Sequence, residues 1–424
     1  MFEIRTGDCL DVLRGMADSS VDSIVTDPPY GLSFMGKKWD YDVPDVAVWA
    51  ECLRVLKPGG HLLAFAGTRT QHRMAVRIED AGFEIRDMIA WVYGSGFPKS
   101  HDVSKAIDKA AGAEREVVGY SAHKSGIANQ AKGHRTVGGT VAEHVAITTP
   151  ATPAAQQWAG WGTALKPALE PITVARKPLV GTVAENVLQH GTGGINVDGC
   201  RVGTGGGTAK GSKPQGDGRG IYGAGLHGAC EITQLNAGRW PANLVHDGSE
   251  EVVGLFPDGA RPKPGRRAKR GGRPIHGSPT IGTPDAFGTW PADAGGSAAR
   301  FFYCAKASKR DREEGCEGLQ AKELKGMNAS PREGHGEVRN SNRYGNHHPT
   351  VKPTDLMRYL CRLVTPPGGL VLDPFAGSGS TGKGALLEGF RFVGIERDPE
   401  YARIAQARCA AVQPGLPLSG PPSE

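Results

Sequence analysis

The sequence predicts an α/β fold, in which a mainly parallel sheet has helices on both faces. Two observations lead to this prediction: strand-like and helix-like segments alternate at each end of the 424-residue chain, and short turns rich in Gly and Pro separate them. The middle of the chain, in contrast, lacks this alternation and is rich in Gly, Thr, Pro and Arg. We therefore expect one sheet formed by the two ends of the chain and a loop-rich region between them.

The N-terminal part supplies the first elements of this sheet. Its apolar runs predict strands at 21–27, 61–67 and 83–93, and apolar residues at helical spacing predict a helix at 46–56. The Lys-Pro-Gly-Gly sequence at 57–60 predicts a turn between that helix and the next strand.

The C-terminal part repeats the pattern. Helical spacing predicts a helix at 354–364, which a turn connects to a strand at 370–373. A Gly-rich turn then leads to a helix around 384–389, a strand at 391–396 and a final helix at 400–412. Strands that alternate with helices in this way are typical of parallel sheets.

Composition and cysteine usage restrict the class of protein. The formal net charge of +6 is compatible with an anionic partner. The eight cysteines include no Cys-x-x-Cys pair and we expect no signal peptide, which indicates reduced thiols in a cytoplasmic protein rather than disulfides or a zinc site. Because no apolar run approaches the roughly 20 residues of a spanning helix, we expect no membrane insertion.

The first informative stretch is IVTDPPYG, at the end of the strand predicted at 21–27. Pro28 and Pro29 fix their own φ angles, remove two backbone donors and favour an extended conformation at Asp27. The result is a rigid segment that presents a carboxylate, free carbonyl groups and the ring of Tyr30. Such a segment accepts hydrogen bonds but hardly donates them, which suits a substrate that carries an amino group.

The second informative stretch is LDPFAGSGSTGKG, in which a strand ends at Asp373 and three glycines precede a helix. Glycine there permits positive φ angles and lets a ligand approach the backbone. The spacing from Gly377 to Lys383 matches the start of a phosphate-binding GxxxxGK loop, but Gly384 stands where Ser or Thr would bind magnesium. The alternative, which we favour, is a nucleoside-binding turn, because Glu396 lies at the end of the next strand, where an acidic residue would bind ribose.

Together, these stretches resemble the two signature motifs of the amino DNA methyltransferases, which use S-adenosylmethionine. NHHPTVKP, before the helix at 354–364, resembles the family's HPTxKP segment, and the N-terminal GDC around Asp8 resembles its opening. The catalytic motif precedes the cofactor motif, which resembles the family's beta arrangement, with target recognition between them. The resemblance implies a mainly parallel, seven-stranded Rossmann-like methyltransferase sheet and a loop-rich target-recognition region.

This arrangement divides the chain into six parts. We expect a catalytic half with the DPPY motif at 1–112, an insertion at 113–162, a further strand of the catalytic sheet at 163–180, where EPITVARKP is strand-like, a target-recognition region at 181–344, a cofactor-binding half at 345–412 and a flexible tail at 413–424. In the recognition region, the basic run from Arg261 to Arg273 suits either phosphate contacts or a solvated loop.

The resemblance also implies roles for single residues. The catalytic residues would be Asp27, Pro28, Pro29 and Tyr30, with the Asp27 carboxylate accepting from the target amino group and Tyr30 stacking on the base. The residues implied to bind S-adenosylmethionine are Asp8, Cys9, Thr350, Lys352, Asp373, Phe375, Gly377, Ser378, Gly379 and Glu396. We expect no metal site, because the adjacent histidines at 347–348 lack carboxylate or cysteine company at ligand spacing.

The expected reaction is direct in-line transfer of a methyl group to the exocyclic amino group of a base flipped out of double-stranded DNA. The aspartate of the motif resembles adenine-N6 enzymes more than cytosine-N4 enzymes, so we favour adenine. Methylation of the cytosine ring carbon is disfavoured, because no cysteine follows a proline. The alternatives are a cytosine-N4 enzyme, an RNA methyltransferase and a non-catalytic DNA-binding relative. A place in restriction–modification and a homodimer are compatible with this interpretation.

Overall fold

The computed structural model describes residues 1–32, 40–96, 100–122, 144–203, 208–209, 234–235, 238–259, 296–305, 310–323 and 343–412. The chain forms two compact units, of which the larger comprises Met1–Val92 and Leu169–Glu424 and the smaller comprises Tyr93–Ala168. The basic run expected to contact phosphates lies outside the described residues. None of the helices in the described ranges is long and apolar enough to cross a membrane.

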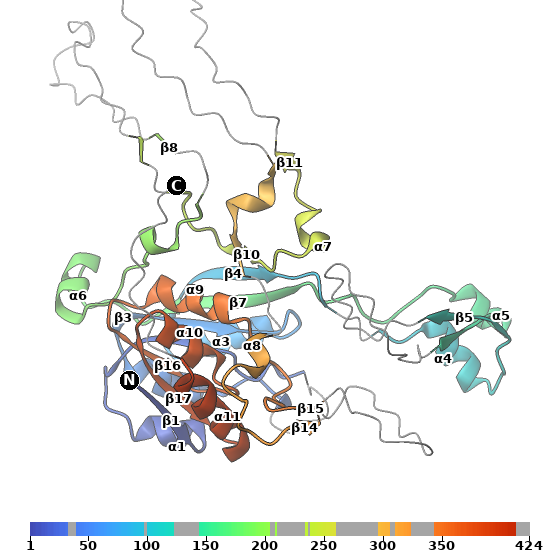
Figure 1. Ribbon diagram of the computed structural model, residues 1–424, viewed down its shortest axis with the longest axis horizontal. Coiled ribbons are helices and arrows are strands. Elements are labelled where there is room, and N and C mark those ends of the chain that lie inside the picture. Colours follow the sequence, from blue (N-terminus) through green and yellow to red (C-terminus); the bar gives the residue numbers. More distant parts are fainter. Residues whose placement is uncertain are drawn as a thin grey trace, which may run out of the picture. The chain divides into compact units, whose positions relative to one another are not determined.

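A sheet of nine strands among the described residues forms the centre of the larger unit, in the order β1-β17-β16-β2-β3-β7-β4-β10-β13 (Figure 1). Its strands are β1 (Phe2–Thr6), β2 (Val21–Thr26), β3 (Leu56–Phe65), β4 (Glu84–Val92), β7 (Leu169–Arg176), β10 (Leu244–His246), β13 (Tyr303–Cys304), β16 (Leu370–Asp373) and β17 (Arg391–Glu396). Neighbouring strands are parallel, except that β7 runs antiparallel to β3 and β4.

The predicted α/β class with a mainly parallel sheet is confirmed, but the strand number differs. Seven strands, from β1 to β4 in spatial order, form the expected sheet, and the short strands β10 and β13 extend it beyond β4. Both come from the segment expected to recognise the target, 181–344. The segment expected to add a strand, 163–180, contains β7.

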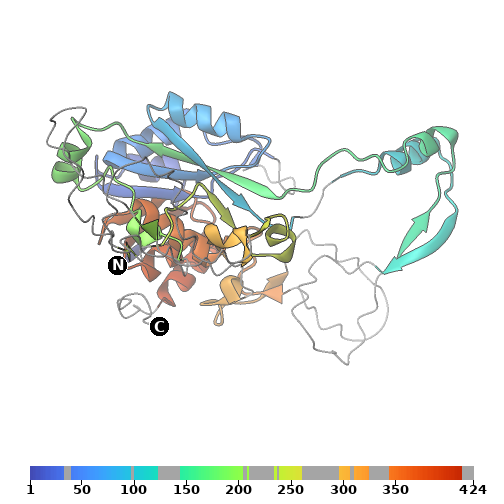
Figure 2. The ribbon, with the colours of Figure 1, turned by 90° about the horizontal axis from the view of Figure 1, so that it is seen from above.

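Two layers of helices cover the sheet (Figures 1 and 2). One layer consists of α9 (Thr354–Val364), α10 (Ser380–Leu387) and α11 (Pro399–Ala410), and the other consists of α1 (Cys9–Arg14), α2 (Val46–Val55) and α3 (Gln71–Asp80). Leu13, Trp49 and Met74 pack from the second layer against apolar residues of the sheet. Strand β2 is buried along its whole length, so the residues that follow it start from a fixed position.

The Lys-Pro-Gly-Gly segment at 57–60 is not a separate turn, because it forms the irregular start of β3. The pairing of β3 with β2 shifts register there, and Gly59 has a φ of +77°. A Cβ atom at Gly59 would lie 2.4 Å from Nδ2 of Asn186, which belongs to α6 (Val183–His190). Glycine is therefore required both by the backbone conformation and by the close approach of α6.

The smaller unit contains α4 (Val103–Ala110), α5 (Pro153–Gln157) and an antiparallel pair, β5 (Val117–Ala122) and β6 (His144–Thr148). Asp108 on α4 is buried, and its carboxylate accepts hydrogen bonds from Arg115 Nη1 (2.6 Å) and Thr152 Oγ1 (2.8 Å). These bonds connect α4 to the segment that begins α5. The insertion expected at 113–162 lies within this unit, which begins earlier.

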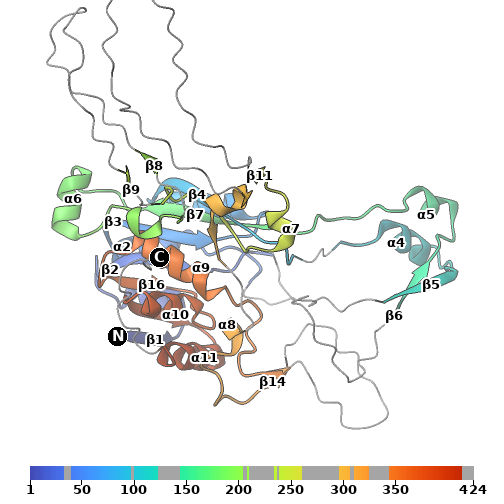
Figure 3. The same cartoon turned by 45° about the horizontal axis from the view of Figure 1, so that its top comes forward.

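The remaining elements are short. They are η3 (Asp198–Cys200), β8 (Thr208–Ala209), β9 (Gln234–Leu235), α7 (Glu250–Val253), β11 (Asp258–Gly259), β12 (Gly296–Ser297), η4 (Ala298–Phe301), α8 (Arg310–Glu313), β14 (Lys322–Glu323) and β15 (Arg343–Tyr344). Helix α8 lies close to α11, seen in Figure 3, and the Arg408 guanidinium on α11 donates to the Asp311 carbonyl at 2.6 Å. This contact ties the segment before the HPTxKP sequence to the C-terminal half of the sheet.

Candidate active site

Strands β2 and β16 are parallel neighbours. Asp27-Pro28 follows β2, and Asp373, the last residue of β16, precedes Pro374 at the same edge of the sheet. The Thr26 hydroxyl at the end of β2 donates to Oδ1 of Asp373 at the end of β16, with a distance of 2.6 Å. The structure thus brings the two motifs together at the carboxyl ends of the strands. In open α/β sheets, this edge is where ligands bind.

Asp27 is bonded by two side chains. Its Oδ2 accepts from Nζ of Lys352 at 2.8 Å, and its Oδ1 accepts from the Tyr30 hydroxyl at 2.6 Å. The side chain of Lys352 is only 9% exposed and that of Asp27 is 20% exposed, so this ion pair is largely shielded from water. Lys352 was expected to bind the cofactor, which stays a prediction; its ammonium contacts the expected catalytic carboxylate.

Glu170 is a fourth member of this cluster, and sequence reasoning missed it. Its Oε2 accepts from the Tyr30 hydroxyl at 2.9 Å and lies 3.1 Å from Nζ of Lys352. Because β7 runs antiparallel to β3 and β4, its first residues lie at the edge where those strands end, and Glu170 pairs with Trp91 there. The available signal was an acidic residue at the start of the strand-like segment. That residue can be placed at the site only once the strand is known to run antiparallel to its neighbours.

The charges of the cluster determine which groups carry protons. Burial lowers the pKa of the Lys352 ammonium, but the carboxylates of Asp27 and Glu170 outweigh it and raise that pKa above its ordinary value. Burial, together with the same two carboxylates, raises the pKa of the Tyr30 phenol well above 10. At neutral pH the cluster therefore holds a charged ammonium and a neutral hydroxyl, both of which are donors.

The backbone after the two prolines is held by Asp40, which is buried and was also missed. The amides of Tyr30 and Gly31 donate to Asp40 Oδ1 at 2.7 and 2.9 Å. Pro28 is buried and Pro29 is half-buried. Since the prolines lack amide protons and Asp40 takes the next two, this segment offers mainly acceptors to a ligand.

The Gly-rich turn after β16 is organised by Asp373. This carboxylate is buried and accepts from Thr26, from Thr381 and, at 3.0 Å, from the amide of Phe375. Burial raises its pKa to about 6 against the lowering effect of these bonds. Gly377 and Gly379 have φ angles of +52° and +77°, which L side chains rarely adopt.

Glu396, at the end of β17, closes the other side of this turn. Its Oε2 accepts from the Gly377 amide and its Oε1 from the Asp398 amide, both at 2.8 Å. Burial raises its pKa to about 7. A carboxylate has about four acceptor positions, so two remain for hydroxyl groups of a ligand.

The expected residues of the N-terminal GDC sequence lie at the same edge. Thr6 of β1 pairs with Glu396 of β17, and Asp8 follows two positions later as an exposed N-cap of α1, accepting from the Leu10 amide at 3.0 Å. Burial raises the pKa of the Cys9 thiol to about 11, so it stays protonated at neutral pH. These positions suit a polar ligand contact at Asp8 and a packing role for Cys9.

The HPTxKP sequence lies against the turn. A Cβ atom at Gly377 would lie 3.0 Å from Nε2 of His348, whose Nδ1 lies 2.7 Å from the Thr350 carbonyl oxygen. Burial lowers the pKa of His348 to about 4, so this ring is neutral at physiological pH. Thr350 itself is exposed. Lys352 thus lies at the cluster around Asp27, and His348 lies at the Gly-rich turn after β16.

Ser378 and Phe375 hold the turn from inside the protein. The guanidinium of Arg408, which is fully buried, donates to the Ser378 carbonyl at 2.6 Å. The Phe375 ring packs near Trp49, with 6.2 Å between ring centroids. Lys383, the lysine of the alternative phosphate loop, is 4% exposed, and its ammonium donates to Glu314 at 2.8 Å. That ammonium is therefore directed at a protein carboxylate.

Comparison with known proteins identifies the family. The family described as DNA methylase, of the N6/N4 type, matches residues 21–127 and 295–407. Over 67 residues, 16% of this chain, the sequence is 52% identical to YubD of Escherichia coli K12, whose methylase assignment is provisional, and the match spans only 30% of that protein.

Among solved structures, the complex of M1.HpyAVI with S-adenosylmethionine covers 96% of this chain and 98% of its own, with 14% identity and a TM-score of 0.38. PvuII DNA methyltransferase, which is cytosine-N4-specific, covers 96% and 86%, with 14% identity and a TM-score of 0.40. Because the family match includes both motifs and more than half of the residues, the chain belongs to the DNA methylase family.

Proposed function

We propose that this protein transfers a methyl group from S-adenosylmethionine to the exocyclic N6 amino group of adenine in double-stranded DNA. The observation that carries the proposal is the position of Asp27. Its carboxylate lies at the carboxyl end of β2, next to the Gly-rich turn, inside a cluster of charged and hydrogen-bonding side chains. The family match, which includes both motifs, supports methyl transfer to an exocyclic amino group of DNA and does not distinguish adenine N6 from cytosine N4.

The residues around the turn fit S-adenosylmethionine. The positive φ angles of Gly377 and Gly379 shape the turn at the end of β16, and Glu396 retains acceptor capacity for ribose hydroxyls. Asp8, exposed at the end of β1, would accept from the adenine amino group of the cofactor. When bound, S-adenosylmethionine supplies the methyl group from a positively charged sulfonium.

Asp27 would act on the target amino group, whose nitrogen is a weak nucleophile because its lone pair is delocalised into the ring. The Asp27 carboxylate and the Pro28 carbonyl accept its two hydrogens, which draws the nitrogen toward a tetrahedral form with its lone pair exposed. As the new nitrogen–carbon bond forms, the sulfur–methyl bond would break and its electron pair would stay on the sulfur as a neutral thioether. The amino nitrogen would lose one proton, which the Asp27 carboxylate would accept. The ring of Tyr30 would stack on the flipped base.

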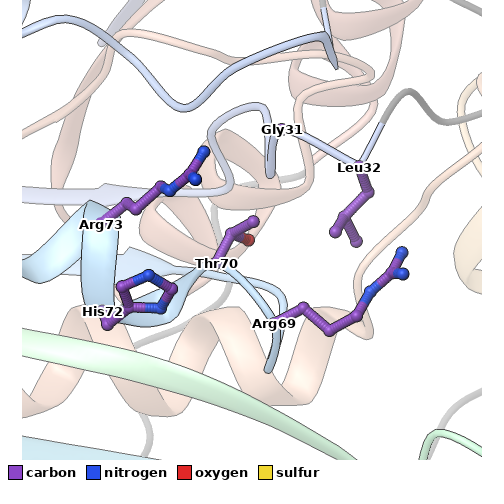
Figure 4. A pocket seen from close by; sticks show the side chains of 6 residues that line it. All are labelled: Gly31, Leu32, Arg69, Thr70, His72 and Arg73. Atoms are coloured by element: carbon purple, nitrogen blue, oxygen red, sulfur yellow. The ribbon is translucent and has the colours of Figure 1, made fainter.

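A basic pocket beside the DPPY sequence suits the DNA backbone. It has a volume of about 340 Å³ and is lined by Arg69, Thr70, His72 and Arg73, opposite Gly31 and Leu32 (Figure 4). Gly31 and Leu32 directly follow Tyr30, so a phosphate in this pocket would lie near the nucleotide whose base enters the site. Such phosphate contacts position DNA without reading its sequence.

The choice of adenine rests on the aspartate at position 27, which resembles adenine-N6 enzymes. A cytosine-N4 enzyme would use the same acceptors on the same kind of amino group, and it is the second candidate function. The two differ in the product nucleoside and not in the mechanism.

The test is methyl transfer from labelled S-adenosylmethionine to unmethylated duplex DNA, followed by digestion and nucleoside mass analysis, with Asp27→Ala as the control. We expect N6-methyldeoxyadenosine with the wild-type protein and none with the variant. N4-methyldeoxycytidine would overturn the choice of base. Cofactor binding without a DNA product would overturn the proposal and favour RNA or a binding role.

A further inference from the structure

Asp27, as the structure shows it, is occupied on both oxygens. The Lys352 ammonium binds one oxygen and the Tyr30 hydroxyl binds the other, at 2.8 and 2.6 Å. A carboxylate has about four acceptor positions, so a target amino group would share the oxygens of Asp27 with two donors of the protein itself. An ammonium held entirely by Asp27 would also withdraw charge from that carboxylate and make it a weaker acceptor.

Glu170 offers the same two donors a second place. The Tyr30 hydroxyl lies 2.9 Å from Glu170 Oε2, and the Lys352 ammonium lies 3.1 Å from the same oxygen. The hydroxyl has one proton and can donate to only one carboxylate at a time, whereas the ammonium has three protons and can bridge both. Tyr30 thus has two alternative hydrogen-bonded states that differ in which carboxylate it serves.

Burial makes this second place necessary. The Lys352 side chain is 9% exposed and that of Glu170 is 19% exposed. If a substrate took Asp27 and no other carboxylate were near, the ammonium would remain buried without a partner, which is strongly unfavourable. With two carboxylates and one ammonium, the cluster keeps one negative charge that is not balanced within it.

We propose that Glu170 is a positioning residue that receives the Tyr30 hydroxyl and the Lys352 ammonium when a target amino group engages Asp27. Glu170 thereby frees the acceptor oxygens of Asp27 and keeps the buried lysine paired. This inference rests on the proposed function of Asp27 and adds a residue that acts through Tyr30 and Lys352 rather than by touching the base.

The first test is the kinetics of Glu170→Gln, which keeps the size of the side chain and removes its charge. We expect kcat to fall about tenfold, less than the roughly 100-fold or more expected for losing a group that contacts the reacting atoms. The affinity for S-adenosylmethionine should not change, and Glu170→Asp should restore part of kcat. An unchanged kcat would overturn the proposal.

The second test is a double-mutant cycle with Lys352→Met. If Glu170 acts in part through Lys352, then Glu170→Gln should cause a smaller loss of methyl transfer in the Lys352→Met protein than in the wild type, because only its contact with Tyr30 remains. An equal loss in both backgrounds would show that Glu170 acts independently and would overturn the proposal.

The same four proteins also give a readout that does not require activity. Without Lys352, the carboxylates of Asp27 and Glu170 face each other across the Tyr30 hydroxyl without a cation. Glu170→Gln should therefore raise the melting temperature of the Lys352→Met protein, and it should not raise that of the wild type. A lower melting temperature in both backgrounds would contradict the idea that Asp27 and Glu170 share the Lys352 ammonium, and would overturn the proposal. Absence of methyl transfer by the wild type would instead overturn the proposed function and leave this thermal cycle as the test of Glu170.

Discussion

Asp27 and Asp373 lie at the ends of neighbouring parallel strands and both precede a proline, yet their surroundings differ. The Asp27 carboxylate accepts hydrogen bonds from the charged Lys352 ammonium and from the Tyr30 hydroxyl. Asp373 is bonded by two threonine hydroxyls and the Phe375 amide, and burial raises its pKa to about 6. At the end of β2, a charged ammonium and a phenol hydroxyl surround the Asp27 carboxylate. At the end of β16, the Asp373 carboxylate fixes the conformation of the backbone turn.

This difference predicts two kinds of sensitivity to mutation. At the end of β2, the charge of the side chain should matter most if Asp27 acts on the substrate as proposed. At the ends of β16 and β17, the backbone conformation of the turn and the acceptor capacity of Glu396 should matter most if they bind the cofactor as proposed. Each of the following changes tests one side of this comparison.

The largest effect is expected for Asp27→Asn. Asparagine has nearly the same shape, but it lacks the negatively charged carboxylate that would accept the amino hydrogens and the released proton. We expect kcat to fall by at least about 100-fold, as for loss of one group that stabilises a transition state. Binding of S-adenosylmethionine, measured by calorimetry, should not change.

Asp80→Asn is the matched control, since Asp80 is exposed at the end of α3. It should leave both kcat and cofactor binding unchanged. If Asp27→Asn retained most of the wild-type kcat, the end of β2 would not be the site of chemistry and the comparison would fail.

The second effect is expected for Glu396→Gln, on cofactor affinity. Hydrogen bonds to charged groups contribute about 1.5–3 kcal/mol, so we expect the Kd for S-adenosylmethionine to rise roughly 10- to 100-fold. At saturating cofactor, kcat should change far less. Glu400→Gln provides the control, because Glu400 is exposed in the first turn of α11. A change in kcat alone would contradict a cofactor role for Glu396.

The same carboxylate predicts how cofactor binding depends on pH. Burial raises the pKa of Glu396 to about 7 in the free protein, and hydroxyl donors of a ribose favour its ionised form. Binding should therefore release a proton, and affinity should fall as the pH drops below about 7. Calorimetry in two buffers with different ionisation enthalpies measures this release. Glu396→Gln should abolish it near pH 7, leaving at lower pH the contribution of Asp373, whose pKa is about 6.

The third effect concerns the backbone at the end of β16. Gly379 has a φ of +77°, and a Cβ atom there would lie 2.9 Å from the Ala405 Cα. Gly389 has a φ of +81° with open space around it. Gly389→Ala should therefore lower the free energy of unfolding by about 1–2 kcal/mol through the backbone alone. Gly379→Ala should cost about 1–3 kcal/mol more through overpacking, measured by denaturant unfolding. Equal losses would show that the turn tolerates a side chain.

The sequence predicted the parts of this arrangement that depend on local pattern. Alternating segments at both ends of the chain predicted the mainly parallel sheet, and Asp27 and Asp373 were identified from the sequences that follow β2 and β16. Strands β10 and β13 escaped prediction because two or three residues carry no detectable periodicity.

The residues that were missed depend on tertiary placement. Glu170 belongs to a segment that was expected to be a strand, but only the antiparallel direction of β7 brings its first residues to the edge of the site. Asp40 binds the amides of residues nine and ten positions earlier in the chain. Lys352 was identified from its motif, but its contact with Asp27 depends on the fold and could not be predicted from the sequence.

The smallest effect is expected at the basic pocket beside Gly31 and Leu32, and it asks whether the end of β2 is also the DNA side of the site. Each phosphate contact contributes about 0.9 to the slope of log K against log salt. Arg69→Ala and Arg73→Ala should each weaken DNA binding a few-fold at low salt and reduce that slope by about 1. Cofactor affinity should not change, because the cofactor turn lies at the end of β16. Arg14→Ala, on the exposed side of α1, should leave the slope unchanged. If the pocket variants kept the wild-type salt slope, the DNA backbone would have to run elsewhere on the protein, and the division of the edge into a DNA side and a cofactor side would lose its electrostatic support.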